Sequence, residues 1–524
     1  MPLPISHLDF DPPERFNQAA FLVDRHLTEG RSANVAYYFR GGAITYADLA
    51  GACNRAGNAL LALGMTPGQR VGIVLPDRPE LPFTYLGAMK AGLVPVPLNP
   101  LQSVEETAYC LEDGGMRVIV TDEKSAAMVR EACGTGTGKP AIVVVTENGH
   151  PPPGSLDYAD LMAAQRDAME AADTLSRDTA FWMYSSGTTG RPKAVVHRHR
   201  DVVHYQAPFA ESVLGVTESD RLLATSKMFF SYGRNASIEV PLLYGASAVL
   251  FPERPSAEAL LDAIATYRPT IFLSVPTFYA ALIEHARGSD RSDLSSLRMV
   301  ISSGEALPQA LFDRWKEVSG LEIVETLGST DAGAQYLSNY PGAVRPGSAG
   351  RLLPRFEERV VDENGEDIAR GEVGTLLLKG KGTASQYWNK PDQTADTFLG
   401  EWLDTGDLVR VDEDGYHWFQ GRSTDMFKVR GMWIAPLEVE SELITHPAVR
   451  ECAVVDAPDG RGLSQAKAVV VVREGIDGSV ALADELREHV AGRLAPYKVP
   501  ASVEFVGALP RTATGKLQRF MLRG

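Results

Sequence analysis

The sequence is poor in the features that mark several large protein classes. It has only four cysteines in 524 residues, and none belongs to a C-x-x-C pair: Cys53, Cys110, Cys133 and Cys452. This spacing argues against a disulfide framework and a zinc site, and it is typical of free thiols in a reducing compartment. Positive charge is also in deficit, because 67 acidic residues face 51 lysines and arginines. An acidic chain lacks the basic face of a general nucleic-acid binder.

Long hydrophobic runs are lacking as well. No apolar stretch approaches the roughly 20 residues that a membrane-spanning helix needs. The first ten residues, MPLPISHLDF, show neither the basic nor the apolar region of a signal peptide. We therefore expect a cytoplasmic protein without a membrane or nucleic-acid partner, and its length predicts at least two domains.

What the sequence does contain is an alternation of strand-like and helix-like segments. Apolar runs at 70–76, 93–99, 117–122 and 141–147 are separated by segments with apolar residues at helical spacing. Such alternation predicts parallel sheets with right-handed crossovers. The segment NGHPPPG at 148–154 predicts a surface linker, and the alternation resumes with the strand-like AFWMY at 180–184.

The composition and pattern of the sequence change twice more. Glycine-rich turns become frequent from Pro341, which predicts short antiparallel strands, and the last hundred residues return to an α/β pattern. We expect an α/β protein with a large N-terminal domain over 1–421, made of two parallel α/β units and a small β-rich subdomain. A small α/β domain should occupy 422–524.

One polar loop follows directly after a predicted buried strand. The segment YSSGTTGRPKAVVH at 184–197 combines glycines, hydroxyl side chains and Lys193. Glycines let backbone N–H groups converge on one point, and such nests bind anions. The spacing is not the G-x-x-x-x-G-K-[ST] of the P-loop, so we predict a different kind of polyphosphate site.

Six ordered segments carry a family resemblance that spans nearly the whole chain. They are YSSGTTGRPKAVVH, SSGEALP (302–308), LGSTDAG (327–333), EWLDTGDLVR (401–410), GRSTDMFKVRGMWIAPLEVE (421–440) and PRTATGKLQR (510–519). Together they resemble the adenylate-forming superfamily of acyl-CoA synthetases, luciferases and peptide-synthetase adenylation domains. The resemblance implies that ATP activates a carboxylate as an acyl-adenylate, which a thiol then attacks.

The resemblance also implies roles for individual residues. Residues expected to act in catalysis are Lys516, Thr330 and Lys193. Residues expected to bind ATP or CoA are Ser185, Ser186, Gly187, Thr188, Thr189, Gly190, Lys193, Gly304, Glu305, Ala306, Glu325, Thr326, Leu327, Gly328, Ser329, Thr330, Asp407, Arg422, Lys428 and Gly431. Thr330 would hydrogen-bond the α-phosphate, and Glu325 would bind the adenine amino group. Asp407 would accept both ribose hydroxyls, with Arg422 near the ribose and the α-phosphate. Asp331 would help to hold Mg²⁺.

Three positions depart from the family pattern. Asp331 stands where most members have glutamate, so its contact with the metal would run through water. Leu327 replaces an aromatic residue against the adenine, and Thr424 replaces the usual aspartate at the hinge. The resemblance further implies that the C-terminal domain is mobile: it would place Lys516 in the site for adenylation, then rotate so that 428–433 line the path of the thiol.

The identity of the acid is indicated by two segments, 227–250 and 328–339, which look like the benzoate–CoA ligase branch. The acid pocket is then expected to contain Ser231, Tyr232, Ser303, Gly328, Ala334, Gln335 and Lys516. Serine at 231 and 303, where alanine is expected, adds hydrogen-bonding capacity. Because unpaired buried polar groups are costly, we predict an amino- or hydroxybenzoate, such as anthranilate, as the substrate of an aryl-CoA ligase.

Other functions fit parts of the same pattern. A stand-alone adenylation enzyme would load the aryl group onto a carrier protein, but FSYG stands at 230–233 where those relatives have an HNY-like motif. A non-catalytic nucleotide-binding protein would not need Lys516, Thr330, Asp407 and Arg422 together, and nothing points specifically to a luciferase-type oxygenase. We expect a monomer or a homodimer.

Two basic features are most simply explained by ordinary structural roles. The segment HRHRDVVH at 197–204 predicts a basic collar beside the phosphates or a solvated helix start rather than a metal site. Arg234 is expected to form a salt bridge in solvent, or else to face a polar substituent of the substrate or CoA.

Overall fold

The structure is a computed structural model that describes residues 6–134, 138–185, 191–286, 293–304, 307–429, 432–458, 464–511 and 517–523. The chain divides into two compact units. The first consists of Met1–Glu358, Leu377–Thr405 and Gly415–His417, and the second of Arg359–Leu376, Gly406–Asp414 and Trp418–Gly524. The predicted boundary at residue 421 stays a prediction.

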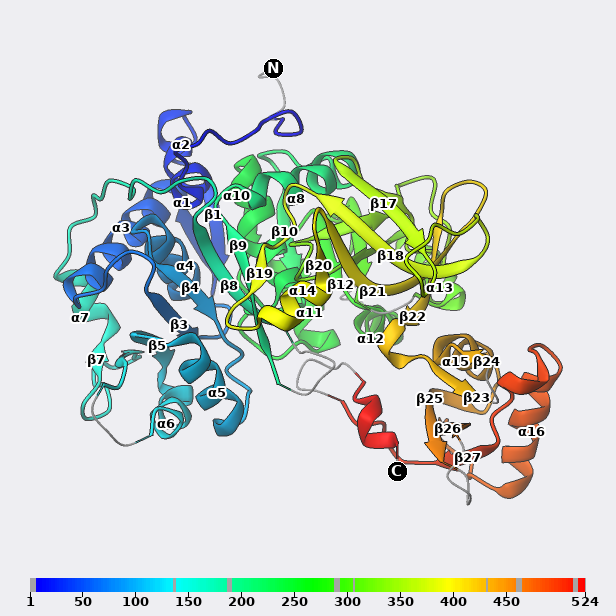
Figure 1. Cartoon of the computed structure of the whole chain (residues 1–524). Helices are drawn as coiled ribbons and strands as arrows, with labels where there is room; N and C mark the ends of the chain where they lie inside the picture. The colour runs from blue at the N-terminus through cyan, green and yellow to red at the C-terminus, as the bar shows by residue number, and fades with distance from the viewer. Residues whose placement is uncertain are drawn as a thin grey trace. The chain divides into compact units, whose positions relative to one another are not determined.

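The first parallel α/β layer of the larger unit follows the predicted alternation. Its strands, in spatial order, are β4 (Val94–Pro97), β3 (Arg70–Val74), β5 (Val118–Asp122), β6 (Ala141–Val145) and β7 (Leu156–Asp157), and all neighbours are parallel. The sheet lies between two helix pairs (Figure 1): α3 (Tyr46–Ala62) with α4 (Glu80–Lys90), and α5 (Val104–Gly114) with α6 (Glu123–Ala132). Helix α5 begins at a capping box, in which Ser103 and Glu106 each satisfy the other's backbone N–H.

The prediction of a linker at 148–154 is wrong. This segment is a loop between β6 and β7, and both strands belong to the same parallel sheet. Prolines and glycine break the strand pattern in any surface loop, so composition alone does not separate a loop within a sheet from a linker between units.

The second α/β layer holds a nine-stranded sheet. Its spatial order is β16 (Arg351–Leu352), β15 (Gln335–Ser338), β14 (Ile323–Gly328), β13 (Met299–Ser303), β12 (Ile271–Ser274), β10 (Arg221–Ala224), β11 (Ser247–Val249), β1 (Val35–Phe39) and β2 (Gly42–Thr45). Strands from β14 to β1 are parallel, and the pairs at both edges are antiparallel.

Buried aromatic and aliphatic side chains attach helices to this sheet. Trp315 and Tyr279 are fully buried against strand residues such as Phe272 and Val300. The helices of this layer are α8 (Asp201–Phe209), α9 (Ser231–Arg234), α10 (Val240–Tyr244), α11 (Ala257–Tyr267), α12 (Pro276–Ala286) and α13 (Gln309–Ser319). A π-helical turn, η2 (Asn235–Glu239), joins α9 to α10.

The strand that precedes the polar loop departs from the predicted pattern. Strand β8 (Thr179–Ser185) pairs antiparallel with β9 (Lys193–Arg198), and β19 (Gln386–Tyr387) adds a third strand on the other side of β9. The predicted phosphate loop therefore connects two strands of a hairpin rather than a strand and a helix. An antiparallel pair needs only a short connection, whereas parallel strands need a crossover.

The rest of the chain is built from shorter sheets, as predicted from Pro341 onward. One sheet contains β17 (Phe356–Val361), β18 (Val373–Gly380), β21 (Trp402–Val411), β20 (Phe398–Leu399) and β22 (His417–Arg422). The C-terminal part contains β23 (Phe427–Val429), β24 (Met432–Ile434), β25 (Val449–Pro458), β26 (Ser464–Val472), β27 (Ser502–Phe505), α15 (Pro436–Ile444) and α16 (Val480–Ala491). Its core is a separate cluster that includes Val439, Leu443, Val470 and Leu486.

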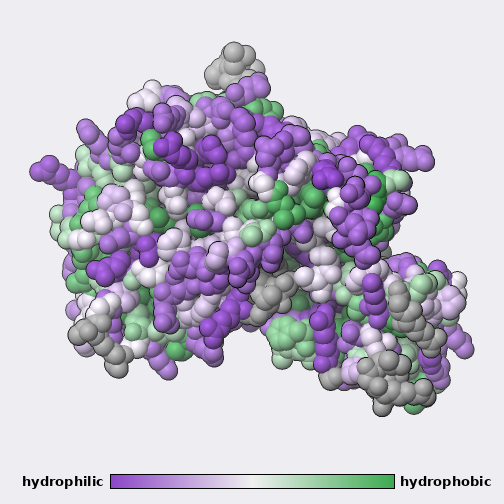
Figure 2. All heavy atoms as spheres, in the orientation of Figure 1, coloured by the Kyte–Doolittle hydropathy of each residue, from purple (hydrophilic) through white to green (hydrophobic). Residues whose placement is uncertain are grey.

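The surface agrees with the polar composition. The face drawn in Figure 2 is mostly hydrophilic, with apolar residues scattered over it. Among the described residues, no helix combines the length and apolarity that crossing a membrane requires.

Candidate active site

Several predicted substrate residues lie at the carboxyl ends of neighbouring parallel strands. Ser303 ends β13 and Gly328 ends β14. The Tyr232 hydroxyl lies 3.5 Å from the carbonyl oxygens of both Ser274, at the end of β12, and Ile301. Ligands of open α/β sheets bind beyond the carboxyl ends of the strands, so the sheet places these residues where a ligand is expected.

The turn after β14 is held in shape by its own hydrogen bonds. The Ser329 N–H donates to the Ala334 carbonyl at 3.3 Å, and the Ser329 hydroxyl accepts the Ala332 N–H at 3.0 Å. Gly333 adopts a φ of 87°, and a Cβ there would lie 2.3 Å from the Tyr205 ring. Only glycine satisfies both conditions, so the turn is tightly specified.

Thr330 is the point at which three distant segments meet. Its hydroxyl lies 3.1 Å from the hydroxyl of Ser231 at the start of α9. Its carbonyl lies 2.8 Å from Nε2 of His197 on β9. Thr330, the predicted α-phosphate residue, is therefore in direct contact with the start of α9, which is predicted to bind the acid. It is also in contact with the strand that follows the phosphate loop.

A second set of contacts links Asp331 to Lys193. The Tyr387 hydroxyl donates a hydrogen bond to Oδ1 of Asp331, and the Lys193 Nζ lies 3.7 Å from the centre of the Tyr387 ring. Burial, reinforced by Asp331, raises the pKa of Tyr387 well above its ordinary value, so the phenol remains a donor. Sequence reasoning missed Tyr387, because nothing local in SQYWNK marks its tyrosine.

The acid pocket residues differ in how fully they are hydrogen-bonded. The Ser303 hydroxyl donates to the Thr326 carbonyl at 3.1 Å. Gln335, paired with Gly328 across the β14–β15 register, is only 3% exposed. Its Oε1 atom is buried and has no hydrogen-bond partner among the residues that the structure describes. Gly328 must remain small, because a Cβ there would lie 2.6 Å from the Ala334 carbonyl oxygen.

Glu325, the predicted partner of the adenine amino group, lies on β14 and is 5% exposed. Its Oε1 accepts the Leu307 N–H at 3.1 Å. Burial raises the pKa of Glu325 to about 8. The carboxyl group is therefore mostly protonated at neutral pH in this state, and it still offers a carbonyl oxygen as an acceptor.

The smaller unit contains the predicted ribose residues. Asp407 on β21 is completely buried, and its Oδ1 lies 2.9 Å from Nε of Arg422 at the end of β22. The Lys428 Nζ lies 4.4 Å from the Trp433 ring across the β23–β24 hairpin. Asp407 and Arg422 are thus in direct contact, and their role at the ribose stays a prediction.

The remaining predicted positions lie outside the described residues: Ser186, Gly187, Thr188, Thr189, Gly190, Glu305, Ala306, Gly431 and Lys516. Ser185 and Lys193, which border the first of these segments, are paired across the β8–β9 hairpin. Gly304 follows β13 with a φ of 90°.

Two expectations for the basic features are wrong, while the alternative that Arg234 faces a polar substituent of the substrate or CoA stays a prediction. Arg234 is fully buried rather than in solvent: its Nε lies 3.5 Å from Glu239, and its guanidinium lies 4.1 Å from the Phe181 ring. The histidines of 197–204 form neither a collar nor a solvated helix start, because all three are buried. The His197 ring stacks on the Phe181 ring, with 4.9 Å between the two ring centres. Packing of His197 against Phe181, its partner on the neighbouring strand, overrides the polarity of the segment.

Comparisons with known proteins identify the family of the chain. A model of the AMP-binding enzyme family matches residues 24–388, and a model of its C-terminal domain matches residues 438–516. The chain belongs to the AMP-binding enzyme family, which confirms the resemblance to adenylate-forming enzymes.

Within that family, the chain groups with benzoate–CoA ligase-like proteins. A benzoate–CoA ligase of Thauera aromatica is 40% identical over 98% of this chain and 96% of its own length. A 4-hydroxybenzoate–CoA/benzoate–CoA ligase of Rhodopseudomonas palustris is 37% identical, with coverage of 98% and 94%. The crystal structure of the anthranilate CoA ligase AuaEII in complex with anthranoyl-AMP aligns with a TM-score of 0.90 at 37% identity, and covers 99% of this chain and 98% of that one.

Proposed function

We propose that this protein is an ATP-dependent aryl-CoA ligase that converts an amino- or hydroxybenzoate, such as anthranilate, to its CoA thioester. The observation that carries the proposal is the 3.1 Å contact between the hydroxyls of Ser231 and Thr330. Ser231, which we propose to contact the aryl acid, therefore lies within one hydrogen bond of Thr330, which we propose to bind the α-phosphate.

The reaction requires two steps. A carboxylate oxygen of the acid attacks the α-phosphorus of ATP, and the bond to the bridging oxygen breaks as pyrophosphate leaves. The CoA sulfur then attacks the acyl carbon, the bond to the AMP oxygen breaks, and the thiol proton passes to solvent. In both steps negative charge gathers at the phosphate, so the enzyme contributes mainly positioning and charge neutralisation.

We assign the charge-stabilising roles to Lys193, Thr330 and Lys516. Lys193 would bind the outer phosphates from the start of β9, and the Thr330 hydroxyl would donate to the α-phosphate. Lys516 would approach with the C-terminal domain, which we place at 422–524, and would neutralise the carboxylate and the α-phosphate as they meet. Asp407 would accept the ribose hydroxyls with Arg422 beside it.

Asp331 is a suitable ligand for Mg²⁺. Its carboxylate is half-buried beside Thr330, one oxygen is oriented by the Tyr387 hydroxyl, and carboxylate oxygen is the ligand type that Mg²⁺ prefers. When bound, the ion would neutralise charge on the phosphates.

The preference for a ring that carries a donor group is supported by Gln335. A buried acceptor without a partner costs about 1–3 kcal/mol, and an amino or hydroxyl group on the ring would supply the missing donor. The Ser303 hydroxyl already donates to Thr326, so its oxygen can serve as a further acceptor.

The test is ATP–pyrophosphate exchange with a panel of benzoates, repeated with CoA while thioester is measured. We expect exchange and thioester formation with an amino- or hydroxybenzoate. Exchange without thioester would redirect the proposal to a carrier protein as acceptor. A specificity constant for unsubstituted benzoate more than about tenfold above the others would contradict the pocket assignment.

A further inference from the structure

Tyr387 connects two groups that the reaction uses but that are distant in sequence. Strand β19 pairs antiparallel with β9, with Tyr387 opposite Val195. Lys193 lies two residues before Val195 and therefore on the same face of β9. Diagonal neighbours on one face of an antiparallel pair are within reach of long and aromatic side chains. The strand register thus explains why the Lys193 ammonium lies 3.7 Å from the ring centre.

The same segment also holds Asp331 at two places. The Ala384 N–H donates to the Asp331 carbonyl at 2.8 Å, and the Tyr387 hydroxyl donates to Oδ1 of the Asp331 side chain. Backbone and carboxylate are therefore both oriented by residues 384–387.

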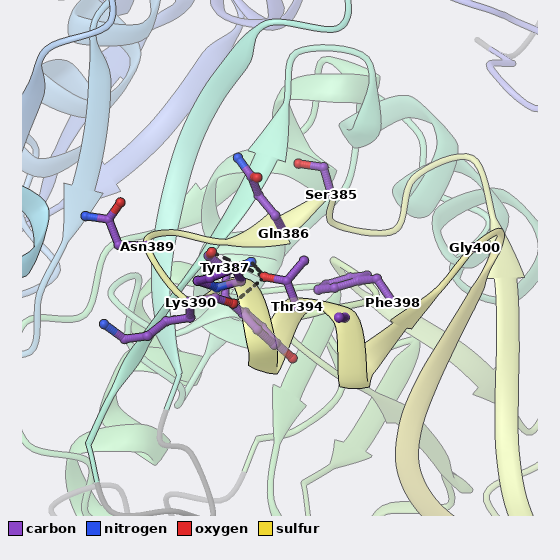
Figure 3. Close-up of a pocket in the computed structure, with 10 residues that line it drawn as sticks. Ser385, Gln386, Tyr387, Asn389, Lys390, Thr394, Phe398 and Gly400 are labelled. Carbon is purple, nitrogen blue, oxygen red and sulfur yellow. Dashed lines mark hydrogen bonds between the residues drawn. The ribbon is translucent and has the colours of Figure 1, made fainter.

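The tyrosine itself is firmly held. It is 2% exposed, its N–H donates to Oγ1 of Thr394 at 3.0 Å, and its ring centre lies 5.2 Å from that of Phe398. These residues lie beside a hollow of about 540 Å³ that is lined by residues of β19 and α14 (Pro391–Thr397). Figure 3 shows how they are arranged. A rigidly placed donor fixes the orientation of its acceptor better than a mobile one does.

We propose that Tyr387 is a positioning residue, which orients the Asp331 carboxylate through its hydroxyl and the Lys193 ammonium through its ring, so that both meet magnesium–ATP in one arrangement. This inference rests on the proposed function, because it takes Asp331 as the metal ligand and Lys193 as a phosphate ligand. Tyr387 acts through these two residues and need not touch the substrate.

Tyr387→Phe separates the two contacts, because it removes the hydroxyl and keeps the ring beside Lys193. The matched control is Tyr244→Phe. Tyr244 is also buried, and its hydroxyl also donates to a carboxylate, that of Glu211, at 2.8 Å.

The measurement is ATP binding by calorimetry over a series of Mg²⁺ concentrations, without any acid. We expect Tyr387→Phe to raise the Mg²⁺ concentration for half-maximal ATP binding by about tenfold, as the loss of a hydrogen bond to a charged group predicts. Tyr244→Phe should leave it within about twofold of the parent protein, and the KM for the aryl acid should not change in either variant.

Asp331→Asn provides the second arm. If Tyr387 acts through Asp331, adding Tyr387→Phe to Asp331→Asn should change Mg²⁺-dependent ATP binding by less than about twofold. An unchanged Mg²⁺ requirement in Tyr387→Phe, or an equal effect with and without Asp331→Asn, would overturn the inference. Because no acid is present, these results are independent of whether an aryl acid is the substrate.

Discussion

The Thr330–Asp331 turn and the Asp407–Arg422 pair assemble their functional groups in different ways. At the turn, the contacts come from Ser231, His197 and Tyr387, which lie 99, 133 and 56 residues from their partners. Asp407 and Arg422 lie on β21 and β22, which pair with each other through a short connection. One site depends on the packing of a whole unit and the other on a local pair of strands, so they should respond differently to substitution.

The largest expected effect is at the local pair. Asp407→Ala removes the proposed acceptor of two ribose hydroxyls and leaves Arg422 without its carboxylate, so kcat/KM for ATP should fall by about a hundredfold or more. Steady-state pyrophosphate exchange measures this. Glu413→Ala, an exposed position between the same two strands, is the control and should leave the value unchanged. A loss below about fivefold in Asp407→Ala would argue that ribose is bound elsewhere.

The turn should be tested by a pair of substitutions at one position. Thr330→Val replaces the hydroxyl by a methyl group of similar size and should lower the rate of adenylation by about 10- to 100-fold. Thr330→Ser keeps the hydroxyl and should remain within about threefold of the parent. Single-turnover formation of the acyl-adenylate distinguishes them. Equal rates in the two variants would mean that the hydroxyl has no role in the step.

A smaller change is expected in the acid pocket. Gln335→Leu replaces the buried acceptor, which has no hydrogen-bond partner in the described part of the chain, by an apolar side chain of similar size. The ratio of kcat/KM for anthranilate or hydroxybenzoate to that for benzoate should fall by about tenfold. Competition between the acids in the exchange assay gives the ratio directly. An unchanged ratio would remove Gln335 from the set of specificity residues.

The last prediction concerns stability rather than activity, so it is measured on a different scale. The pKa of Glu325 in the folded protein, about 8, lies above its ordinary value of 4.5. The neutral form is therefore favoured in the fold, and the stability it contributes is complete below pH 4.5 and lost as the pH rises through 8. The free energy of unfolding should fall by at most about 1.4 kcal/mol per pH unit across that window.

Glu325→Gln should remove this dependence, which denaturant unfolding at pH 5 to 9 can measure. Glu322→Gln is the control, because its carboxyl is half-buried just before the same strand and Lys316 lowers its pKa. A carboxyl group with a lowered pKa affects stability only at acid pH. This variant should therefore show the same decrease in the free energy of unfolding with pH as the parent protein. A slope in Glu325→Gln equal to that of the parent would contradict the raised pKa.

Much of the architecture could be predicted because it depends on local patterns. The apolar runs at 70–76, 93–99, 117–122 and 141–147 became β3, β4, β5 and β6, and they form the predicted parallel sheet. The AFWMY segment is also a strand, but its antiparallel pairing with β9 was not predicted. Periodicity reveals that a segment is extended, whereas the identity of its neighbour depends on the whole chain.

The sequence by itself determined the family, the order of its motifs and the residue types at the candidate site. These survive as short patterns of glycines, hydroxyls and charges, because phosphate and carboxylate chemistry requires such groups in a fixed local order. The tertiary structure alone decided that Tyr387 joins Lys193 to Asp331, that Arg234 is buried against Phe181, and that the histidines of 197–204 lie in the core. Each depends on contacts between elements far apart in the chain, and burial and pairing energies of that kind are set by packing rather than by the residue's neighbours in sequence.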